Sequence, residues 1–249
     1  MTSAASPRAV AEPTLDRLRD TGGMSTGDAL RLERPADGVV RLTLARPDKR
    51  NALSVALRDE ISDALDALAD DDTVRAAIVT GEGSTFCAGF DLSEFTVDDA
   101  EFQQRLWASS DRYHRTVLCF PLPIIAAVNG PALAGGFDLA VMCDIRVAAD
   151  TAVFAHPENR FGDVVYGPLH ALVGGSIARD LCLTGRRIDA AEALAMHIVS
   201  RVVAADEVAA VALDMAVQIA AAPREVSMRT KAKALRAAGV DPDAPTLSL

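Results

Sequence analysis

Two glycine-rich junctions constrain the fold of this chain more than any other feature. Each joins a short apolar run, typical of a strand, to a helical pattern; the first lies in residues 84–92 and the second in residues 127–138. The first N–H groups of a helix have no acceptor within the helix, and the helix dipole places partial positive charge there. Two such donors converging on one oxygen would form an oxyanion hole, so the pair of junctions favours chemistry over a plain loop.

The composition excludes several classes of protein. The 249 residues suffice for one large domain with a substantial core, and half of them are hydrophobic. A formal charge of -10 and the lack of a basic stripe argue against a nucleic-acid partner. No apolar run approaches the length of a membrane span, and the N-terminus lacks a hydrophobic signal core, so we expect a cytoplasmic protein without a membrane partner.

The cysteines lie far apart in the sequence. Their spacing matches neither a zinc site nor a redox motif, so we interpret all four as reduced thiols: Cys87, Cys119, Cys143 and Cys182. We therefore expect no metal and no redox cofactor.

Strands alternate with helices in the first part of the chain, and helices dominate the second part. Strands are predicted at 40–44, 76–80, 124–128, 145–148, 152–155 and 199–203. Helices are predicted from Ser54 past Leu68, over 98–118, up to about Met142, and over 169–183, 189–196, 205–222 and 225–238. This order predicts an α/β fold with a helical C-terminal region from about residue 168.

One domain is expected over residues 29–249, because no long linker or charge run divides the chain. Residues 1–28 lack a sustained period and are predicted to form a disordered N-terminal extension. Met24 is then an alternative start of the protein.

A series of motifs resembles the crotonase superfamily, the enoyl-CoA hydratase/isomerase family. The similarity runs from about residue 30 to at least residue 229. The order and spacing of the motifs support the resemblance more strongly than any single motif. The motifs are LARPDKRNAL at 44–53, FCAGFDL at 86–92, AVNGPA at 127–132, CDIR at 143–146, FAHPE at 154–158 and LTGRRIDA at 183–190. The resemblance implies a crotonase-like spiral of β-β-α turns, a coenzyme A thioester substrate, and trimers that often pair into hexamers.

The resemblance also assigns roles in substrate binding. It implies that the oxyanion donors are the backbone N–H groups of Phe90 and Gly135, where glycine lets the main chain approach the thioester oxygen. Lys49 and Arg50 become candidate contacts to the phosphates of coenzyme A, beside the 88–92 loop. The remaining candidate substrate-binding residues are Ala88, Gly89, Asp91, Leu92, Gly136 and Tyr166.

Two carboxylic acids match the glutamates that hold the reacting water in the hydratases of this family. They are Asp138 and Glu158, and burial beside each other would push their pKa values apart, as acid–base catalysis requires. Aspartate is one methylene shorter than glutamate, so its carboxylate should fall roughly 1–1.5 Å short of the usual position. Misplacement on that scale costs about a hundredfold in rate.

The stretch after Glu158 departs from the Gly-rich sequence common in hydratases. It contains Tyr166 and His170, which either line the acyl pocket or pack beside it. His156 is interpreted as fixing a turn or a hydrogen bond rather than as a catalyst.

These observations predict an enoyl-CoA hydratase that adds water across a trans-2-enoyl-CoA. Glu158 would be the main acid and base, and Asp138 would position the water. The alternative is an enoyl-CoA isomerase in which Glu158 alone moves a proton. A second alternative is a non-catalytic acyl-CoA binder, which the presence of acids at both positions argues against.

Overall fold

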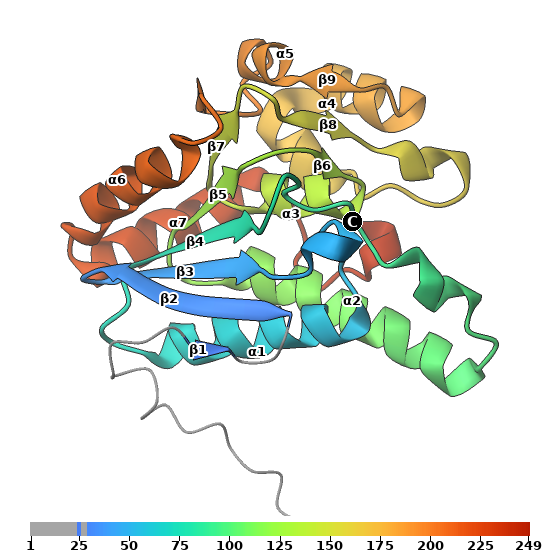
Figure 1. The fold of residues 1–249 in the computed structure, drawn as a ribbon, viewed down its shortest axis with the longest axis horizontal. Helices are drawn as coiled ribbons and strands as arrows, with labels where there is room; N and C mark the ends of the chain where they lie inside the picture. The colour runs from blue at the N-terminus through green and yellow to red at the C-terminus, as the bar shows by residue number, and fades with distance from the viewer. Residues whose placement is uncertain (1–23, 26–28) are drawn as a thin grey trace, which may run out of the picture.

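A twisted sheet of seven strands forms the centre of the molecule (Figure 1). The computed structural model describes residues 24–25 and 29–249. The strands follow the order β1 (Met24–Ser25), β2 (Leu30–Ala36), β3 (Val39–Leu44), β4 (Ala76–Gly81), β5 (Ile124–Val128), β7 (Ile145–Ala149) and β10 (Arg201–Val203). Pairing is antiparallel from β1 to β3 and parallel from β3 to β10. The parallel part follows from the predicted strands that alternate with helices.

A second sheet of three short strands lies beside the main one. Its order is β6 (Ala132–Leu133), β8 (Val153–Ala155) and β9 (Ile188–Asp189), with β6 and β8 parallel. In the chain, β6 follows β5 of the main sheet, and β8 follows β7 of the main sheet. The chain therefore passes from one sheet to the other within a few residues, which gives the spiral predicted above.

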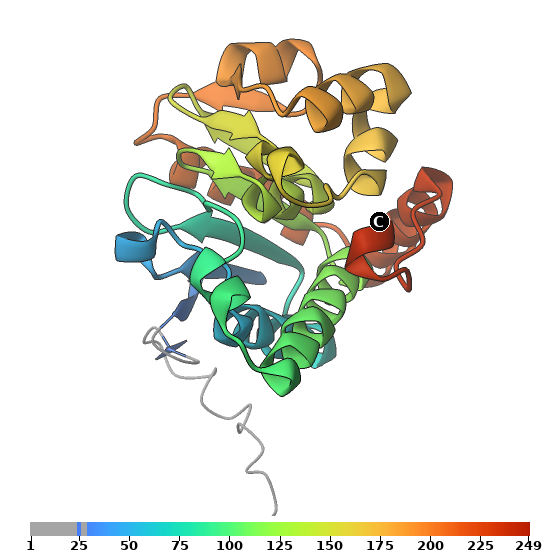
Figure 2. The same cartoon turned by 90° about the vertical axis from the view of Figure 1, so that its right-hand side faces the viewer.

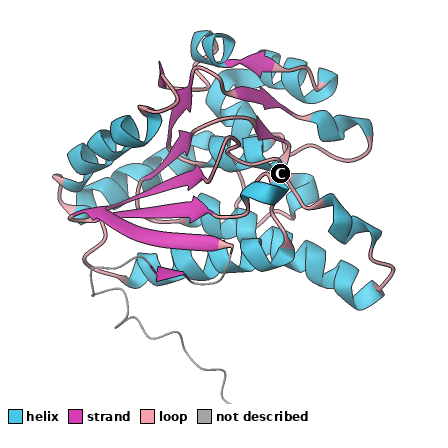
Figure 3. Cartoon of the chain, viewed as in Figure 1, coloured by secondary structure: helices cyan, strands magenta, loops and turns pink. Residues whose placement is uncertain are grey.

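Helices enclose both sheets, as Figures 1 and 3 show. They are α1 (Val55–Asp70), α2 (Ala100–Cys119), α3 (Gly135–Met142), α4 (Gly167–Thr184), α5 (Ala190–Ala195), α6 (Val208–Ala220) and α7 (Arg224–Ala238). Short 3-10 turns are η2 (Pro47–Lys49), η3 (Leu92–Thr96), η4 (Pro157–Arg160) and η5 (Thr246–Ser248). Among the described residues, no helix is long and apolar enough to cross a membrane.

The start of α1 confirms the predicted cap. Ser54 Oγ accepts a hydrogen bond from the Leu57 N–H at 3.2 Å, and the predicted apolar face of the helix is buried. Figure 2 shows the C-terminal segment lying next to α2, where the Thr246 N–H donates to Asp111 Oδ1 at 2.8 Å.

Four strands were missed by the sequence interpretation: β1, β2, β6 and β9. β2 has only two strongly buried apolar residues, Leu30 and Leu32, and it contains a proline and three charged or polar positions, so its alternation is weak. Its pairing with β3 holds it in place instead. Met24–Ser25 pair with β2, so the predicted disorder is wrong for these two residues; the rest of that prediction lies outside the described residues. The strands β6 and β9, of two residues each, are too short to give a pattern.

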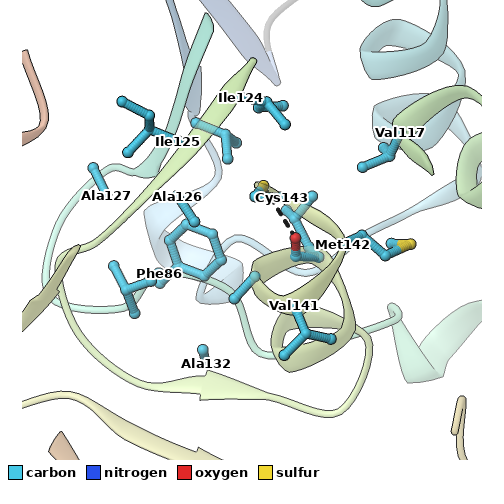
Figure 4. Close-up of a cluster of buried hydrophobic side chains, with 14 of the residues drawn as sticks. Phe86, Val117, Ile124, Ile125, Ala126, Ala127, Ala132, Val141, Met142 and Cys143 are labelled. Carbon is cyan, nitrogen blue, oxygen red and sulfur yellow. Dashed lines mark hydrogen bonds between the residues drawn. The ribbon is translucent and has the colours of Figure 1, made fainter. Parts of the chain in front are cut away.

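The helix α3 runs through the hydrophobic core, and all of its residues are buried. Figure 4 shows Val141 and Met142 at its end, within the cluster of buried side chains that also contains Phe86 and the residues of β5. The Cys143 thiol follows and donates to the Leu139 carbonyl at 3.2 Å. Because α3 is buried on every side, the one acidic residue it carries, Asp138, lies in the core as well.

Candidate functional site

The two glycine junctions lie against each other. Cys87 and Ala132 form a parallel bridge, in which the Leu133 N–H donates to the Cys87 carbonyl at 2.9 Å. Gly136, the second residue of α3, touches the same carbonyl: a Cβ built on it would lie 2.2 Å from Cys87 O. Only glycine permits that approach, so the sequence Gly135-Gly136 brings the start of α3 against the first junction.

Each junction presents one backbone N–H group without an acceptor among the described residues. Leu53 bonds to the residues on either side of Phe90, because its N–H donates to Gly89 O (2.8 Å) and its carbonyl accepts from the Asp91 N–H (3.3 Å). The N–H of Phe90 itself therefore points away from Leu53. Gly135 is the first residue of α3, and neither its N–H nor that of Phe90 has an acceptor among the described residues.

Backbone geometry brings Gly89, in the first junction, close to the Gly135 N–H. Gly89 has φ +92°, and a Cβ built on it would lie 3.1 Å from the Gly135 nitrogen. Ala134 also has a positive φ, 52°, which is strained for a residue with a side chain. Its N–H is held by Ala155 O at 2.9 Å, so the strained turn is tied to β8.

The ring of Phe90 packs on Gly135 and under a buried arginine. A Cβ on Gly135 would lie 2.9 Å from Phe90 Cδ1, and the Arg58 guanidinium lies 4.3 Å from the ring centroid. Arg58 also donates to Leu53 O (2.9 Å) and Leu106 O (3.1 Å). Desolvation by burial lowers its pKa. Sequence reasoning missed Arg58, although an arginine on the apolar face of a predicted helix is a recognisable signal.

The two predicted acids come together beside this junction. Asp138 lies one turn into α3, and Glu158 lies in η4, directly after β8. The pairing of Leu133 with Ala155 in the small sheet sets the distance between these two segments. Carboxyl oxygens of both acids and a ring nitrogen of His156 all lie within 4.8 Å of one another.

His156 lies between the acids and is fully buried. Its Nδ1 is 2.9 Å from Glu158 Oε1 and 3.7 Å from Asp138 Oδ1. The predicted hydrogen-bonding role of His156 is confirmed, but its place between the two acids was not foreseen. The only sequence signal was its position two residues before Glu158. Because Nδ1 is engaged by Glu158, we interpret the cluster as an acid–base group, and the absence of a metal stays a prediction.

Burial dominates the electrostatics of this cluster. Desolvation raises the pKa of Asp138 to about 7; His156 opposes the shift, and the charge of Glu158 adds to it. Desolvation lowers the pKa of His156, but the hydrogen bond to Glu158 and the charge of Asp138 outweigh it and raise the pKa overall. Asp138 Oδ1 and Glu158 Oε2 are buried without a hydrogen-bond partner in the described structure, which leaves both oxygens free for a substrate or water.

The other predicted residues border the first junction or stand apart from it. Lys49 and Arg50 are exposed, and the Arg50 carbonyl accepts from the Ala88 N–H at 3.0 Å, so their loop adjoins the 88–92 segment. The Asp91 carboxylate instead binds Arg46 at 2.9 Å and caps η3, which gives it a structural task. Leu92 is exposed, and Tyr166 lies at the start of α4 with its ring 5.3 Å from that of His170.

The family model for enoyl-CoA hydratase/isomerase matches residues 34–246. This chain belongs to that family. A "Probable enoyl-CoA hydratase echA8" of Mycobacterium bovis is 42% identical over 171 residues, which cover 67% of this chain and 65% of the relative. The chain thus matches slightly less than two thirds of that relative's length. A "Putative enoyl-CoA hydratase" of Thermus thermophilus is 41% identical over 63% of this chain and 64% of its own.

Solved structures agree with the family membership. An enoyl-CoA hydratase from Bacillus anthracis superposes with a TM-score of 0.80 at 31% identity, over 86% of this chain and 84% of that chain. An enoyl-CoA hydratase from Mycobacterium smegmatis gives 0.78 at 34% identity, over 86% and 84%. The predicted crotonase-like fold is confirmed, and the chain belongs to the crotonase superfamily.

Proposed function

We propose that this family member is an enoyl-CoA hydratase acting on trans-2-enoyl-CoA thioesters. The observation that carries the proposal is the pair of acids, Asp138 and Glu158, buried together beside two unpaired backbone N–H groups. Hydration needs these parts. Water must lose a proton as its oxygen bonds to the β-carbon, the α-carbon must gain a proton, and the thioester oxygen must carry negative charge meanwhile.

In this proposal the Phe90 and Gly135 N–H groups donate to the thioester oxygen. A donor of this kind stabilises a transition state by about 3–4 kcal/mol. Glu158, the more exposed acid, takes the proton from water and delivers a proton to the α-carbon, and Asp138 positions the water. The chemistry requires no cofactor beyond the coenzyme A of the substrate.

Substrate binding would use the neighbouring loops. Lys49 and Arg50 would contact the phosphates of coenzyme A, the loop from Ala88 to Leu92 would contact the pantetheine, and Tyr166 would border the acyl group. We further propose a homotrimer or a hexamer in the cytoplasm, in line with the family resemblance; size-exclusion chromatography with light scattering tests the assembly.

The test is the loss of enoyl absorbance when the protein meets crotonyl-CoA, repeated with a longer trans-2-enoyl-CoA. Replacing Glu158 with glutamine keeps its size but removes the base, so turnover should fall about 10²- to 10⁴-fold while acyl-CoA binding remains. Glu225→Gln is the matched control, because Glu225 is an exposed residue at the start of α7. Wild-type turnover in Glu158→Gln would overturn the mechanism.

An enoyl-CoA isomerase is the second candidate. Two observations on Asp138 favour it. The side chain of Asp138 is 6% exposed against 14% for Glu158. The raised pKa of Asp138 keeps a large fraction of its carboxyl group protonated near neutral pH. An isomerase needs only one accessible carboxylate. Turnover of a 3-enoyl-CoA without hydration of crotonyl-CoA would select this function, and saturable binding without either reaction would select the non-catalytic binder.

A further inference from the structure

We propose that His156 is a positioning residue that holds one oxygen of Glu158 and thereby aims the other at the substrate. The proposal rests on the function proposed above for Glu158, and it gives a role to a buried group that neither acid–base step uses directly. It concerns the orientation of Glu158 and the separation of two neighbouring acids.

The imidazole itself is firmly held. His156 is fully buried, and its ring stacks on that of Phe137 with centroids 4.7 Å apart and an interplanar angle of 29°. The preceding residue, Ala155, is paired in β8 and accepts from Ala134, and the following residue is a proline, which restricts the backbone of His156. The ring can therefore act as a fixed reference for groups that bind it.

Glu158 has no comparable support of its own. Its side chain extends from the short 3-10 turn η4, and within the described structure only the hydrogen bond from His156 fixes its carboxyl group. The 2.9 Å bond ties Oε1 to the imidazole, and Oε2 stays buried without a partner. The bond thus divides the carboxyl group into one held oxygen and one free oxygen.

The surroundings of Nδ1 place a proton on that nitrogen. Both groups that face it are carboxyl oxygens, Glu158 Oε1 and Asp138 Oδ1, so Nδ1–H is the donor in the neutral ring as well as in the charged ring. Nε2 is buried and has no partner in the described structure. Three further titratable groups interact electrostatically with these acids. Cys182 on α4 interacts with both acids, and Asp138 also interacts with Tyr113 on α2 and with Cys87 in the first junction.

This arrangement also bears on the short side chain of Asp138. An Nδ1–H between the two acids reduces the repulsion between them, because it presents positive charge to both. His156 lowers the pKa of Asp138 whereas Glu158 raises it. Removing the imidazole should therefore make Asp138 harder to ionise and leave Glu158 free to rotate.

Three substitutions separate positioning from packing. His156→Asn places an amide N–H near the position of Nδ1, His156→Gln places it near Nε2, and His156→Leu provides no donor. We expect kcat to fall about 10- to 100-fold in His156→Leu and His156→Gln, as for a misplacement near 1 Å, with KM changed less than threefold. His156→Asn should recover most of kcat.

The pH profile gives a readout that packing would not move. Asparagine keeps the donor but carries no charge. Asp138 should therefore ionise at a higher pH in His156→Asn, and the acidic limb of the pH profile of kcat/KM should shift to higher pH. His197→Asn is the matched control, because His197 is exposed and its φ of 61° suits asparagine. Equal losses in all three variants with an unchanged acidic limb would reduce His156 to a packing residue and overturn the proposal.

A measurement without turnover keeps the two proposals distinguishable. Long-range ¹H–¹⁵N spectra of histidine-labelled protein, assigned with His156→Asn, should show a proton on Nδ1 that responds to Glu158→Gln. A proton found only on Nε2 would overturn the role of His156 whatever reaction the enzyme catalyses. A protein with the expected spectrum that turns over neither enoyl-CoA would instead refute the proposed function alone.

Discussion

Gly136→Ala should damage the proposed oxyanion hole through one steric contact. The added Cβ would lie 2.2 Å from Cys87 O, 2.7 Å from Cys87 C and 2.8 Å from Cys87 Cβ. Real Cβ contacts essentially never fall under 3.0 Å, and backbone atoms cannot swing aside as the end of a flexible side chain can. The start of α3 must therefore move away from the first junction by about 1 Å.

That movement separates the Gly135 N–H from the Phe90 N–H. It also strains the Leu133–Cys87 hydrogen bond, which uses the same carbonyl. A 1 Å misplacement costs about 10²-fold in rate, and the loss of one oxyanion donor costs about 10²- to 10³-fold. We expect kcat to fall roughly 100-fold or more, together with a loss of about 1–3 kcal/mol of unfolding free energy from overpacking.

The assay is steady-state hydration of crotonyl-CoA, with thermal unfolding and acyl-CoA binding measured on the same samples. Gly162→Ala serves as the control, since a Cβ on Gly162 meets nothing within 4 Å. If Gly136→Ala is folded and binds acyl-CoA, yet keeps kcat within about threefold of wild type, the second donor is not where we place it.

Two further predictions concern stability. Burial raises the pKa of Asp138 to about 7 in the folded protein, above its ordinary value of 3.8. The folded state therefore binds more protons than the unfolded state between these pH values, and stability falls as the pH rises through this window. Asp138→Asn should remove up to about 4 kcal/mol of this loss of unfolding free energy, so its urea midpoint should exceed that of the wild type at pH 8 but not at pH 4. Parallel curves of urea midpoint against pH for the two proteins would contradict this. Ser54→Ala should lower the free energy of unfolding by about 1 kcal/mol and leave kcat unchanged, because it removes only the cap of α1. An unchanged unfolding midpoint would show that the Leu57 N–H finds another acceptor.

Local patterns predicted most of the secondary structure. The strands β3, β4 and β5 and the helices α1 and α2 carry strong alternation or a clear apolar face, so short-range chemistry is enough to identify them. Weak patterns failed: β2 depends on its partner β3, and β1, β6 and β9 have two residues each. The family motifs extended this prediction to the fold.

The acids of the site were also found from the sequence, because aspartate or glutamate at two motif positions is visible without coordinates. Their consequences were only partly predictable. The apolar neighbours of Asp138 indicated burial, and the raised pKa agrees with this. The role of His156 depends on two distances. Its Nδ1 lies 2.9 Å from Glu158, two residues further along the chain, and 3.7 Å from Asp138, a distance that the pairing of β6 with β8 sets.

The sequence by itself determined which groups could do chemistry: two glycine junctions and two acids. The tertiary structure alone decided how they meet. Gly136 lies against Cys87, Arg58 lies over the ring of Phe90, and His156 lies between Asp138 and Glu158. These contacts join segments that lie up to about fifty residues apart in the chain or belong to different sheets. No local sequence pattern encodes how close such segments come in space. That distance follows only when the strands pair and the core packs.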